Sequence, residues 1–457
     1  MKLLKSFLIV ILLLALLAAC NLIGSSGTPA VVIPATLPAT LVKATQAPAT
    51  PNLPPTQAAT ATFPPVITAT PLPATATSVT KATSVANPTI VPTKGTPVKL
   101  INIHMADTNT GWSIGQLPNA TTDDILRTSD GGKTWKAVTP PEPNLPGKRT
   151  VAYFLDATHA WVTYAKLPGG TLPTTFSVWR TTDGGATWKS SSTSLSGISN
   201  MEGFTTSQVA FQDANNGWLM SVVGAGMSHT YIAVFKTSDG GGTWSLIISP
   251  DKNNVPMSCS KSGLWFRDTS HGLLAGNCYG VIKGLYLYQT SDGGATWTMV
   301  NLPAPAVLTD AFTKEGNSCG ADTPQFFDAQ KAILAVQCSD VATAKTYRWL
   351  YETKDGGATW TSNPLPRAWG GIFFLNIDSG WYLGQTSADS TTGVNVYQTS
   401  DGGKNWKQIS ATQWSGVMDY IDAKNGWVIA KSSNDLAFVR TSDGGLTYIL
   451  VTPQLAP

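Results

Sequence analysis

Charged side chains are scarce in this 457-residue sequence, at 12% of the total. Residues 1–97 contain five lysines and no acid, and the remainder has 25 basic and 27 acidic residues, which leaves it a net charge of −2. Nucleic-acid binding depends on clustered Lys and Arg side chains that meet phosphates. The sequence therefore predicts no nucleic-acid partner, and since it contains no cofactor-binding motif we expect no cofactor.

Histidine and cysteine are also rare. The chain has four histidines and five cysteines, and no two cysteines stand in a Cys-x-x-Cys pair. A structural zinc site needs four Cys or His ligands at close spacing. We therefore expect no bound metal, although metal ligation by the cysteines is the rival to disulfide bonding.

Long apolar runs are absent as well. The longest, Phe7 to Leu17, follows Lys2 and Lys5 and covers about 11 residues, where a membrane-spanning helix needs about 20. Charge, a short apolar core and small residues form the pattern of a secretory signal peptide, predicted here over residues 1–19.

The end of this leader, Leu17-Ala18-Ala19-Cys20, resembles the bacterial lipobox. The resemblance implies cleavage before Cys20 and a lipid on that cysteine, so the protein would be exported and anchored to the cell membrane on its extracytoplasmic side. An ordinary secretory leader with a chance cysteine is the alternative.

Aromatic residues are nearly missing between Cys20 and residue 97, where Thr, Pro and Ala dominate. Proline at this density breaks helices and strands, and without aromatic residues there is little from which to build a core. Residues 20–97 are therefore predicted to be a disordered linker behind the lipidated cysteine.

From residue 98 onward one nonapeptide recurs seven times, as in RTSDGGKTW and QTSDGGATW. The boxes occupy 127–135, 180–188, 236–244, 289–297, 352–360, 398–406 and 440–448. Their aspartates are Asp130, Asp183, Asp239, Asp292, Asp355, Asp401 and Asp443. Spacings of this size are typical of solenoids, propellers and repeat arrays.

Each box is preceded by a second recurring element, as in DTNTGWSIG and DANNGWLMS. These elements occupy 107–115, 156–164, 213–221, 268–276, 328–336, 377–384 and 422–430. Short apolar or alternating runs flank both motifs and are typical of strands bounded by turns. The fold class is therefore all-β, and residues 98–457 are predicted to be a seven-bladed β-propeller of four-stranded antiparallel blades, with each box in the turn between third and fourth strands.

The nonapeptide resembles the Asp box, Ser/Thr-x-Asp-x-Gly-x-x-Trp, of the BNR-repeat superfamily, which includes sialidases and sortilin. The GGxTW endings are most similar to the photosystem II stability/assembly factor propellers. That resemblance implies a binding and assembly scaffold without catalysis, and a structural role for the seven aspartates. Lys354 and Tyr448 depart from the motif, so we expect slightly looser packing at those two turns.

The four remaining cysteines stand at matching offsets in consecutive repeats. Cys259 and Cys278 flank Asp268 by nine and ten residues, and Cys319 and Cys338 flank Asp328 in the same way. An even number of cysteines in an exported chain favours disulfides, for which three connectivities are open. The symmetry of the offsets selects Cys259–Cys278 and Cys319–Cys338.

Binding is predicted on the face opposite the boxes, where the loops vary, because variable loops on a rigid scaffold commonly carry binding sites. The candidates on this face are Arg149, Phe204, Arg367, Trp369 and Trp414. Aromatic and Arg side chains are enriched at interface centres, so a protein or a glycan is the expected partner of a monomeric propeller. The alternative is that the tryptophans pack between blades.

Catalysis is the competing class. The chain has seven arginines, several of them in boxes, and it lacks an Arg-Ile-Pro signature, which argues against a sialidase. A glycoside hydrolase needs two suitably spaced carboxylates, and the best candidates are Asp310, Glu315 and Asp322 in the longest inter-blade connection. The sequence thus favours a non-catalytic binding scaffold, with a sialidase-like or oligoxyloglucan-type hydrolase and a structural envelope protein as alternatives.

The leader generates the first testable prediction. Mass spectrometry of the purified N-terminus is expected to find Cys20 as the first residue, acylated, because the lipobox both directs cleavage and supplies the lipidated thiol. An unmodified cysteine, or an uncleaved start at Met1, would refute the anchor.

Overall fold

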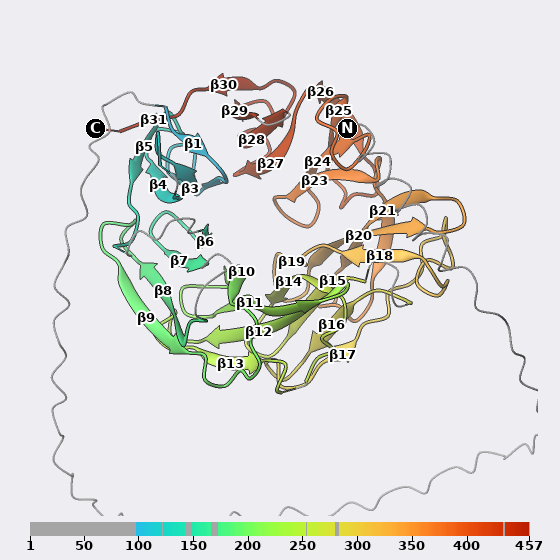
Figure 1. Cartoon of the computed structure of the whole chain (residues 1–457). Coiled ribbons are helices and arrows are strands. Elements are labelled where there is room, and N and C mark those ends of the chain that lie inside the picture. Colours follow the sequence, from blue (N-terminus) through green and yellow to red (C-terminus); the bar gives the residue numbers. More distant parts are fainter. Residues whose placement is uncertain are drawn as a thin grey trace, which may run out of the picture. The chain divides into compact units, whose positions relative to one another are not determined.

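The structure of the protein is a computed structural model that describes residues 97–120, 122–141, 149–165, 172–252, 254–278, 283–432 and 435–456. The predicted signal peptide, Cys20 and the linker up to residue 96 lie outside the described residues. All the regular elements that it describes are β-strands (Figure 1). No described segment forms an apolar helix long enough to cross a membrane.

Four of the sheets are antiparallel meanders of four strands each (Figure 1). The first two contain β6 (Arg149–Phe154), β7 (Ala160–Ala165), β8 (Thr175–Thr181) and β9 (Lys189–Ser194), then β10 (Thr205–Phe211), β11 (Gly217–Gly226), β12 (His229–Thr237) and β13 (Ser245–Ile248). The other two contain β23 (Trp369–Phe374), β24 (Gly380–Gln385), β25 (Val394–Thr399) and β26 (Lys407–Thr412), then β27 (Ser415–Tyr420), β28 (Gly426–Ser432), β29 (Asp435–Thr441) and β30 (Ile449–Val451).

Two larger sheets contain the remaining described strands. The six-stranded sheet contains β1 (Lys99–Leu100), β2 (His104–Met105), β3 (Gly111–Gln116), β4 (Asp124–Thr128), β5 (Thr134–Ala137) and β31 (Gln454–Leu455). The nine-stranded sheet contains β14 (Ser260–Phe266), β15 (Gly272–Asn277), β16 (Leu287–Thr290), β17 (Thr298–Met299), β18 (Ser318–Ala321), β19 (Gln325–Phe326), β20 (Ala332–Asp340), β21 (Lys345–Thr353) and β22 (Thr361–Pro364).

The nine-stranded sheet consists of two meanders joined at one point. Strands β14 to β17 pair in order. In the second group β18 and β19 both pair with β20, which is followed by β21 and β22, and a single bridge between Asn277 and Gly320 connects the two groups. The expected all-β architecture of antiparallel meanders is therefore confirmed, whereas the count of seven blades stays a prediction.

Each meander begins with a hairpin whose turn is closed by one side chain. Asp107 accepts hydrogen bonds from the backbone N–H groups of Asn109 and Thr110, both at 2.7 Å. Asp and Asn favour such turns because their short side chains reach the backbone two or three residues ahead. In the sixth repeat Asn376 has this role, not Asp378, so that the motif begins one residue earlier than the sequence pattern suggested.

The Asp-box turns connect the third and fourth strands. In the first box the Asp130 carboxylate accepts hydrogen bonds from the Thr134 N–H at 2.8 Å and from the hydroxyls of Thr128 and Thr134. These bonds contribute to a lowered Asp130 pKa despite the opposing effect of partial burial. Gly131 and Gly132 have φ angles of 75° and 91°, a region that L side chains rarely adopt.

Both kinds of turn lie on the same end of each meander. The Gly131 N–H donates to the Asn109 carbonyl at 2.8 Å, which ties the box to the first hairpin turn of its own meander. The equivalent bond recurs in all the other boxes, at Gly184, Gly240, Gly293, Gly356, Gly402 and Gly444.

The boxes of Lys354 and Tyr448 both keep the hydrogen bonds of the motif, and the looser packing expected there stays a prediction. Lys354 stands at the variable position, because Thr353 makes the bond that Thr128 makes in the first box, so the expectation that it departs from the motif is wrong. Asp355 and Asp443 bind their turns in the same way as Asp130. Lys354 places its Nζ 2.9 Å from Oε1 of the buried Glu352, and Tyr448 shares a hydrogen bond of 2.9 Å with Tyr420. Each of these two side chains therefore has a partner.

Tryptophans join neighbouring sheets at the seams between them. Trp161 on β7 is buried, stacks on Phe211 of the next sheet with ring centroids 3.6 Å apart, and donates its Nε1–H to the Gly240 carbonyl at 2.8 Å. Trp112, Trp218 and Trp381 donate to the next sheet in the same way. The hydrophobic core therefore lies between sheets, where apolar faces of both are removed from water.

The last sheet contacts the first through the same kind of indole hydrogen bond. Trp427 on β28 donates its Nε1–H to the Gly131 carbonyl at 3.2 Å. Beyond it, the C-terminal strand β31 pairs in parallel with β5 and adds an outer strand to the first sheet. The described sheets thus follow one another and return to the first, which makes the fold propeller-like (Figure 1).

Both predicted disulfides are confirmed, as Cys259–Cys278 and Cys319–Cys338. Cys319 and Cys338 stand opposite each other in the pairing of β18 with β20. Cys259 and Cys278 lie one residue beyond the Ser260–Asn277 pair that begins the β14–β15 hairpin. Because two antiparallel strands of one hairpin place matching offsets side by side, the symmetry argument was sufficient to select the pairing.

Each disulfide is expected to stabilise the fold by about 3 kcal/mol, since it closes a loop of 19 residues in the unfolded chain. Urea denaturation of the double variants Cys259→Ser/Cys278→Ser and Cys319→Ser/Cys338→Ser is the measurement. Unchanged midpoints would show that the bridges contribute nothing to stability.

A buried carboxylate lies where the last sheet meets the first. Asp419 on β27 is 8% exposed and accepts a hydrogen bond from the Met105 N–H of β2 at 2.5 Å. Nδ1 of His104 lies 3.9 Å from its other oxygen. Burial raises the pKa of Asp419 to about 7 against the opposing effect of the Met105 hydrogen bond, and burial lowers the pKa of His104.

Asp419 is expected to make stability depend on pH between about 4 and 7. Its folded pKa lies above the unfolded value of about 3.9, so its contribution is fully present below pH 4 and is lost as pH rises through 7, by up to about 1.4 kcal/mol per pH unit. His104 acts in the opposite sense, because its lowered pKa costs stability as pH falls below about 6.5.

The difference between the wild type and Asp419→Asn isolates the aspartate, since both proteins retain His104. We expect the free energy of unfolding of Asp419→Asn, relative to wild type, to rise between pH 4 and 7 in urea titrations. A difference that does not vary with pH would contradict the raised pKa.

Candidate functional site

The residues predicted for the binding face have different environments. Phe204 is 8% exposed and stacks on Phe176 with ring centroids 5.3 Å apart, so its assignment to the surface is wrong and it belongs to the core. It is buried because the chain before β10 folds back over the sheet. Arg149 begins β6, but its side chain lies outside the described residues.

Trp414 is half-buried in the connection before β27. Its ring meets Tyr448 edge-on, with centroids 5.0 Å apart, beside the Tyr448–Tyr420 hydrogen bond. Trp414 therefore packs on the last Asp box, which favours the alternative that it is a packing residue.

Arg367 and Trp369 lie together at the start of β23. Arg367 is exposed and Trp369 is half-buried. The buried Tyr382 on β24 donates its hydroxyl to the backbone carbonyls of both, at 2.9 Å and 2.5 Å, and so holds the segment in place. Burial raises the Tyr382 pKa to about 12, which keeps the phenol protonated and able to donate.

One arginine that the sequence did not single out connects these residues to a predicted carboxylate. Arg348 on β21 is 9% exposed, donates to the Gly370 carbonyl at 2.6 Å and forms an ion pair with Asp322. Asp322 is itself 56% exposed. A buried guanidinium can satisfy its several N–H donors at two fixed acceptors, so it positions both.

The set Asp322, Arg348, Arg367, Trp369 and Gly370 is called the Arg348 cluster. Its members come from β21, the connection between β18 and β19, and the start of β23. No motif marked Arg348, because it stands in the middle of a strand and becomes informative only through its partners. Arg348 thus links the Asp322 carboxylate to the backbone carbonyl of the residue that follows Trp369.

Two glycines, Gly370 and Gly371, follow Trp369 on β23. Gly370 has a φ angle of 141°, and a Cβ atom there would lie 2.0 Å from the Leu383 carbonyl oxygen. A Cβ atom at Gly371 would lie 2.9 Å from the Gly416 carbonyl oxygen on β27. Glycine is required where two backbones approach this closely, so these residues allow β23 to pack against β24 and β27.

The other two predicted carboxylates, Asp310 and Glu315, have cationic partners different from that of Asp322. Glu315 is 90% exposed and lies 3.9 Å from Lys283. Asp310 lies 4.0 Å from Lys314, whose Nζ bonds the buried Asp340 at 2.7 Å. Within the described part of the chain, the three carboxylates therefore have three separate cationic partners and do not form the pair that glycoside hydrolysis needs.

The amine of Lys261 is held by backbone carbonyls. Lys261 donates its Nζ to the carbonyls of Thr230, Ser258 and Cys259 at 2.8 to 3.1 Å. Burial lowers its pKa to about 7. Since three carbonyls already accept from this amine, it ties β14 to the preceding sheet. No group of three potential metal ligands occurs among the residues that the structure describes.

Comparisons with known proteins show one sequence relative. The chain is 30% identical over 141 residues to a xyloglucanase from Paenibacillus sp, a match that covers 29% of this chain and 13% of the relative. The chain thus spans far less than two thirds of the protein it matches. No family model matches the sequence.

Similar solved structures include an enzyme and a lyase that act on glycans, and a peptidase. They are the GH74 enzyme of Niastella koreensis (TM-score 0.32, 14% identity, 76% of this chain and 62% of that one), a PL25 ulvan lyase (0.43, 11%, 79% and 96%) and a puromycin-hydrolysing peptidase of Mycobacterium tuberculosis (0.48, 10%, 79% and 54%). These similarities are too low to indicate a function.

Proposed function

We propose that this protein acts on glycans, and that it binds them at the Arg348 cluster. The observation that carries the proposal is that Arg348 joins the exposed Asp322 to the backbone at Gly370, next to the half-buried Trp369 in the segment that begins with the exposed Arg367. Sugars are bound by aromatic faces together with a few well-placed polar groups, and this cluster offers both.

A glycan is favoured over a protein partner by the xyloglucanase relative. The preference for a protein-or-glycan scaffold therefore gives way to a glycan-acting protein. The relative's activity concerns a much longer protein, so binding is proposed first. Hydrolysis is the second candidate, with Asp322 as the exposed carboxylate of the cluster.

The finer architecture is part of the same proposal. We propose that the seven box-bearing meanders are seven blades of one closed ring, since the Trp427–Gly131 contact between last and first sheets repeats the contact between earlier ones. The Asp boxes would be its structural turns, of the BNR type. The lipid on Cys20 and the linker over residues 20–97 would tether a monomeric ring to the extracytoplasmic side of the membrane.

Binding is tested with the full-length protein in affinity gels containing xyloglucan, mixed-linkage β-glucan or arabinan. We expect retardation by at least one polysaccharide, and about tenfold weaker binding in Trp369→Ala and Arg367→Ala, because each removes one direct contact worth about 1.4 kcal/mol. Met227→Ala, at a 91% exposed position in the β11–β12 hairpin, is the matched surface control.

Trp414→Ala separates a sugar platform from packing. If Trp414 only packs on Tyr448, this variant lowers the melting temperature and leaves the affinity unchanged. Retardation by none of the polysaccharides, or wild-type retardation of Trp369→Ala and Arg367→Ala, would overturn the proposal.

Hydrolysis is tested in parallel by the release of reducing ends. If Asp322 is catalytic, Asp322→Asn abolishes release while the protein still binds the polysaccharide. Absence of release in the wild type would eliminate this second candidate and leave the binding proposal intact.

A further inference from the structure

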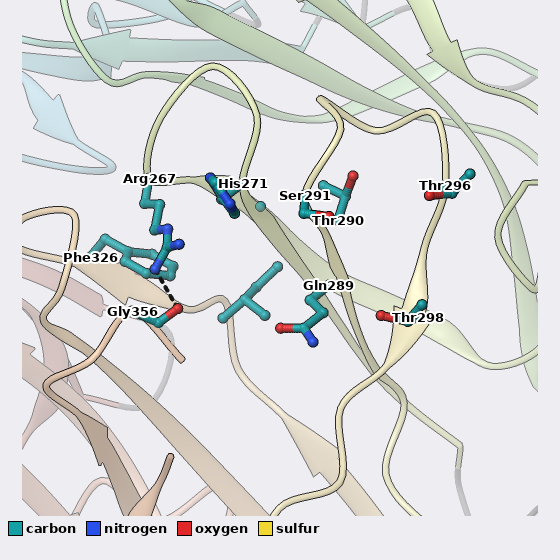
Figure 2. Close-up of a pocket in the computed structure, with 11 residues that line it drawn as sticks. Arg267, His271, Gln289, Thr290, Ser291, Thr296, Thr298, Phe326 and Gly356 are labelled. Carbon is teal, nitrogen blue, oxygen red and sulfur yellow. Dashed lines mark hydrogen bonds between the residues drawn. The ribbon is translucent and has the colours of Figure 1, made fainter. Parts of the chain in front are cut away.

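A pocket of about 140 Å³ lies between the β14–β17 and β18–β22 meanders (Figure 2). Its lining includes Leu273 and Gln289 from the first meander and Phe326 from the second. The Arg348 cluster contributes no lining residue.

This seam lacks the tryptophan that five other repeats place there, as does the next seam, where Ile333 stands and the facing Phe374 is nevertheless buried. Leu273 occupies the position of Trp112, Trp161, Trp218, Trp381 and Trp427, each of which fills a seam. At three of these seams the indole stacks on an aromatic ring of the next sheet, with centroids 3.6 to 5.4 Å apart. Leucine is too short to cover the corresponding ring.

The ring left uncovered is Phe326. Its counterparts Phe154, Phe211, Phe266, Phe374 and Tyr420 are buried, whereas Phe326 is only half-buried. A flat hydrophobic face therefore borders the space where an indole lies at the other seams. Since aromatic faces carry partial negative charge, they attract the weakly positive C–H groups of a ring laid over them.

A second substitution enlarges the same space. The first box residue is Arg127 or Arg440 at other seams, where its guanidinium lies over Trp112 or Trp427 at 4.8 and 5.1 Å. Here it is Gln289, which is shorter and exposed. Two large side chains of the repeat are thus missing at one seam.

Arg267 has taken over the link to the next meander. Its guanidinium donates to the carbonyls of Ala329 at 3.1 Å and Gly356 at 2.5 Å, which holds the two walls of the pocket together. Its Nε is buried without a hydrogen-bond partner, 3.6 Å from the nearest Asp268 oxygen. This nitrogen has almost no accessible surface, so it is not itself a contact for a ligand, and the nearby Asp268 carboxylate balances its charge.

The rim offers uncommitted polar groups. Within the described part of the chain, Gln289, Ser291 and Thr298 make no side-chain hydrogen bond. Figure 2 shows Arg267 and Phe326 on one side of the pocket, and Gln289 and Thr298 on the other. One aromatic face and a rim of amide and hydroxyl groups suit a ring that bears several hydroxyls.

We propose that this seam pocket binds a single pyranose residue, stacked on Phe326 in the place of the missing indole. The choice of a sugar over an aromatic ligand rests on the proposed glycan function. The shape and polarity of the pocket are observed independently of that proposal. The residue can be a free monosaccharide or the terminal unit of a glycan chain. With one ring and few hydrogen bonds, the dissociation constant is expected to be on the order of 1 mM.

The test uses saturation-transfer difference NMR on the full-length protein with the methyl pyranosides of glucose, galactose, xylose and mannose, and with indole as the aromatic probe. We expect at least one pyranoside to bind. The variant Leu273→Trp/Gln289→Arg restores the residues of the filled seams, and it is expected to weaken that binding by about tenfold or more because the indole occupies the site.

Two controls make the result specific. Gln398→Arg changes the equivalent first box residue of another repeat and is expected to leave binding unchanged. Thr298→Arg obstructs the pocket from an exposed strand position, so it tests the site even if the double variant does not fold, which its thermal melting curve reveals.

Several outcomes would overturn the inference. They are binding of indole but of no pyranoside, binding of none of the probes, or wild-type pyranoside binding in folded variants that fill the pocket. Loss of monosaccharide binding in Trp369→Ala with retention in Leu273→Trp/Gln289→Arg would assign the sugar to the Arg348 cluster, and would so support the proposed function while rejecting this pocket. Competition between the bound pyranoside and an oligosaccharide that ends in the same sugar distinguishes the terminal unit of a glycan chain from a free sugar as the ligand.

Discussion

The contact on which the fold depends is the one between neighbouring sheets, where a buried indole stacks on the next sheet and donates to its backbone. A four-stranded sheet cannot bury both of its faces alone, so each meander is stable only beside another. The Trp161 seam combines a stacking distance of 3.6 Å with a hydrogen bond of 2.8 Å. The Trp427 seam repeats this hydrogen bond between the last and first of the described sheets.

The Asp boxes serve these seams by fixing the turns that accept the indole hydrogen bonds. The Gly131 N–H is bound within its own meander, to Asn109, whereas the Gly131 carbonyl accepts from Trp427 of another. One turn therefore links local hairpin geometry to the packing of two sheets. In the boxes at Lys354 and Tyr448 these side chains contact Glu352 and Tyr420, respectively.

Departures from the repeat are informative where the compensation is incomplete. At the seam of Leu273, Arg267 restores the polar link to the next sheet, but nothing restores the lost aromatic volume. At the start of β23, Arg348 holds Asp322 and the Gly370 carbonyl together, and the glycines allow close packing on the neighbouring strands. Both candidate sites thus arise where the chain differs from its own repeat, since a rigid scaffold can place exposed groups only where packing does not need them.

The sequence by itself determined the all-β architecture, the turns and the disulfide pairing, because these depend on local periodicity and on offsets within one hairpin. It did not determine which exposed residues meet. Phe204 and Trp369 have similar sequence contexts, yet Phe204 is buried against Phe176, while Trp369 stands beside an arginine 21 residues earlier in the chain. Only the tertiary structure could decide this, because burial depends on how the connections cross the sheet ends, and the partners Asp322, Arg348 and Gly370 come from separate strands whose approach no local pattern records.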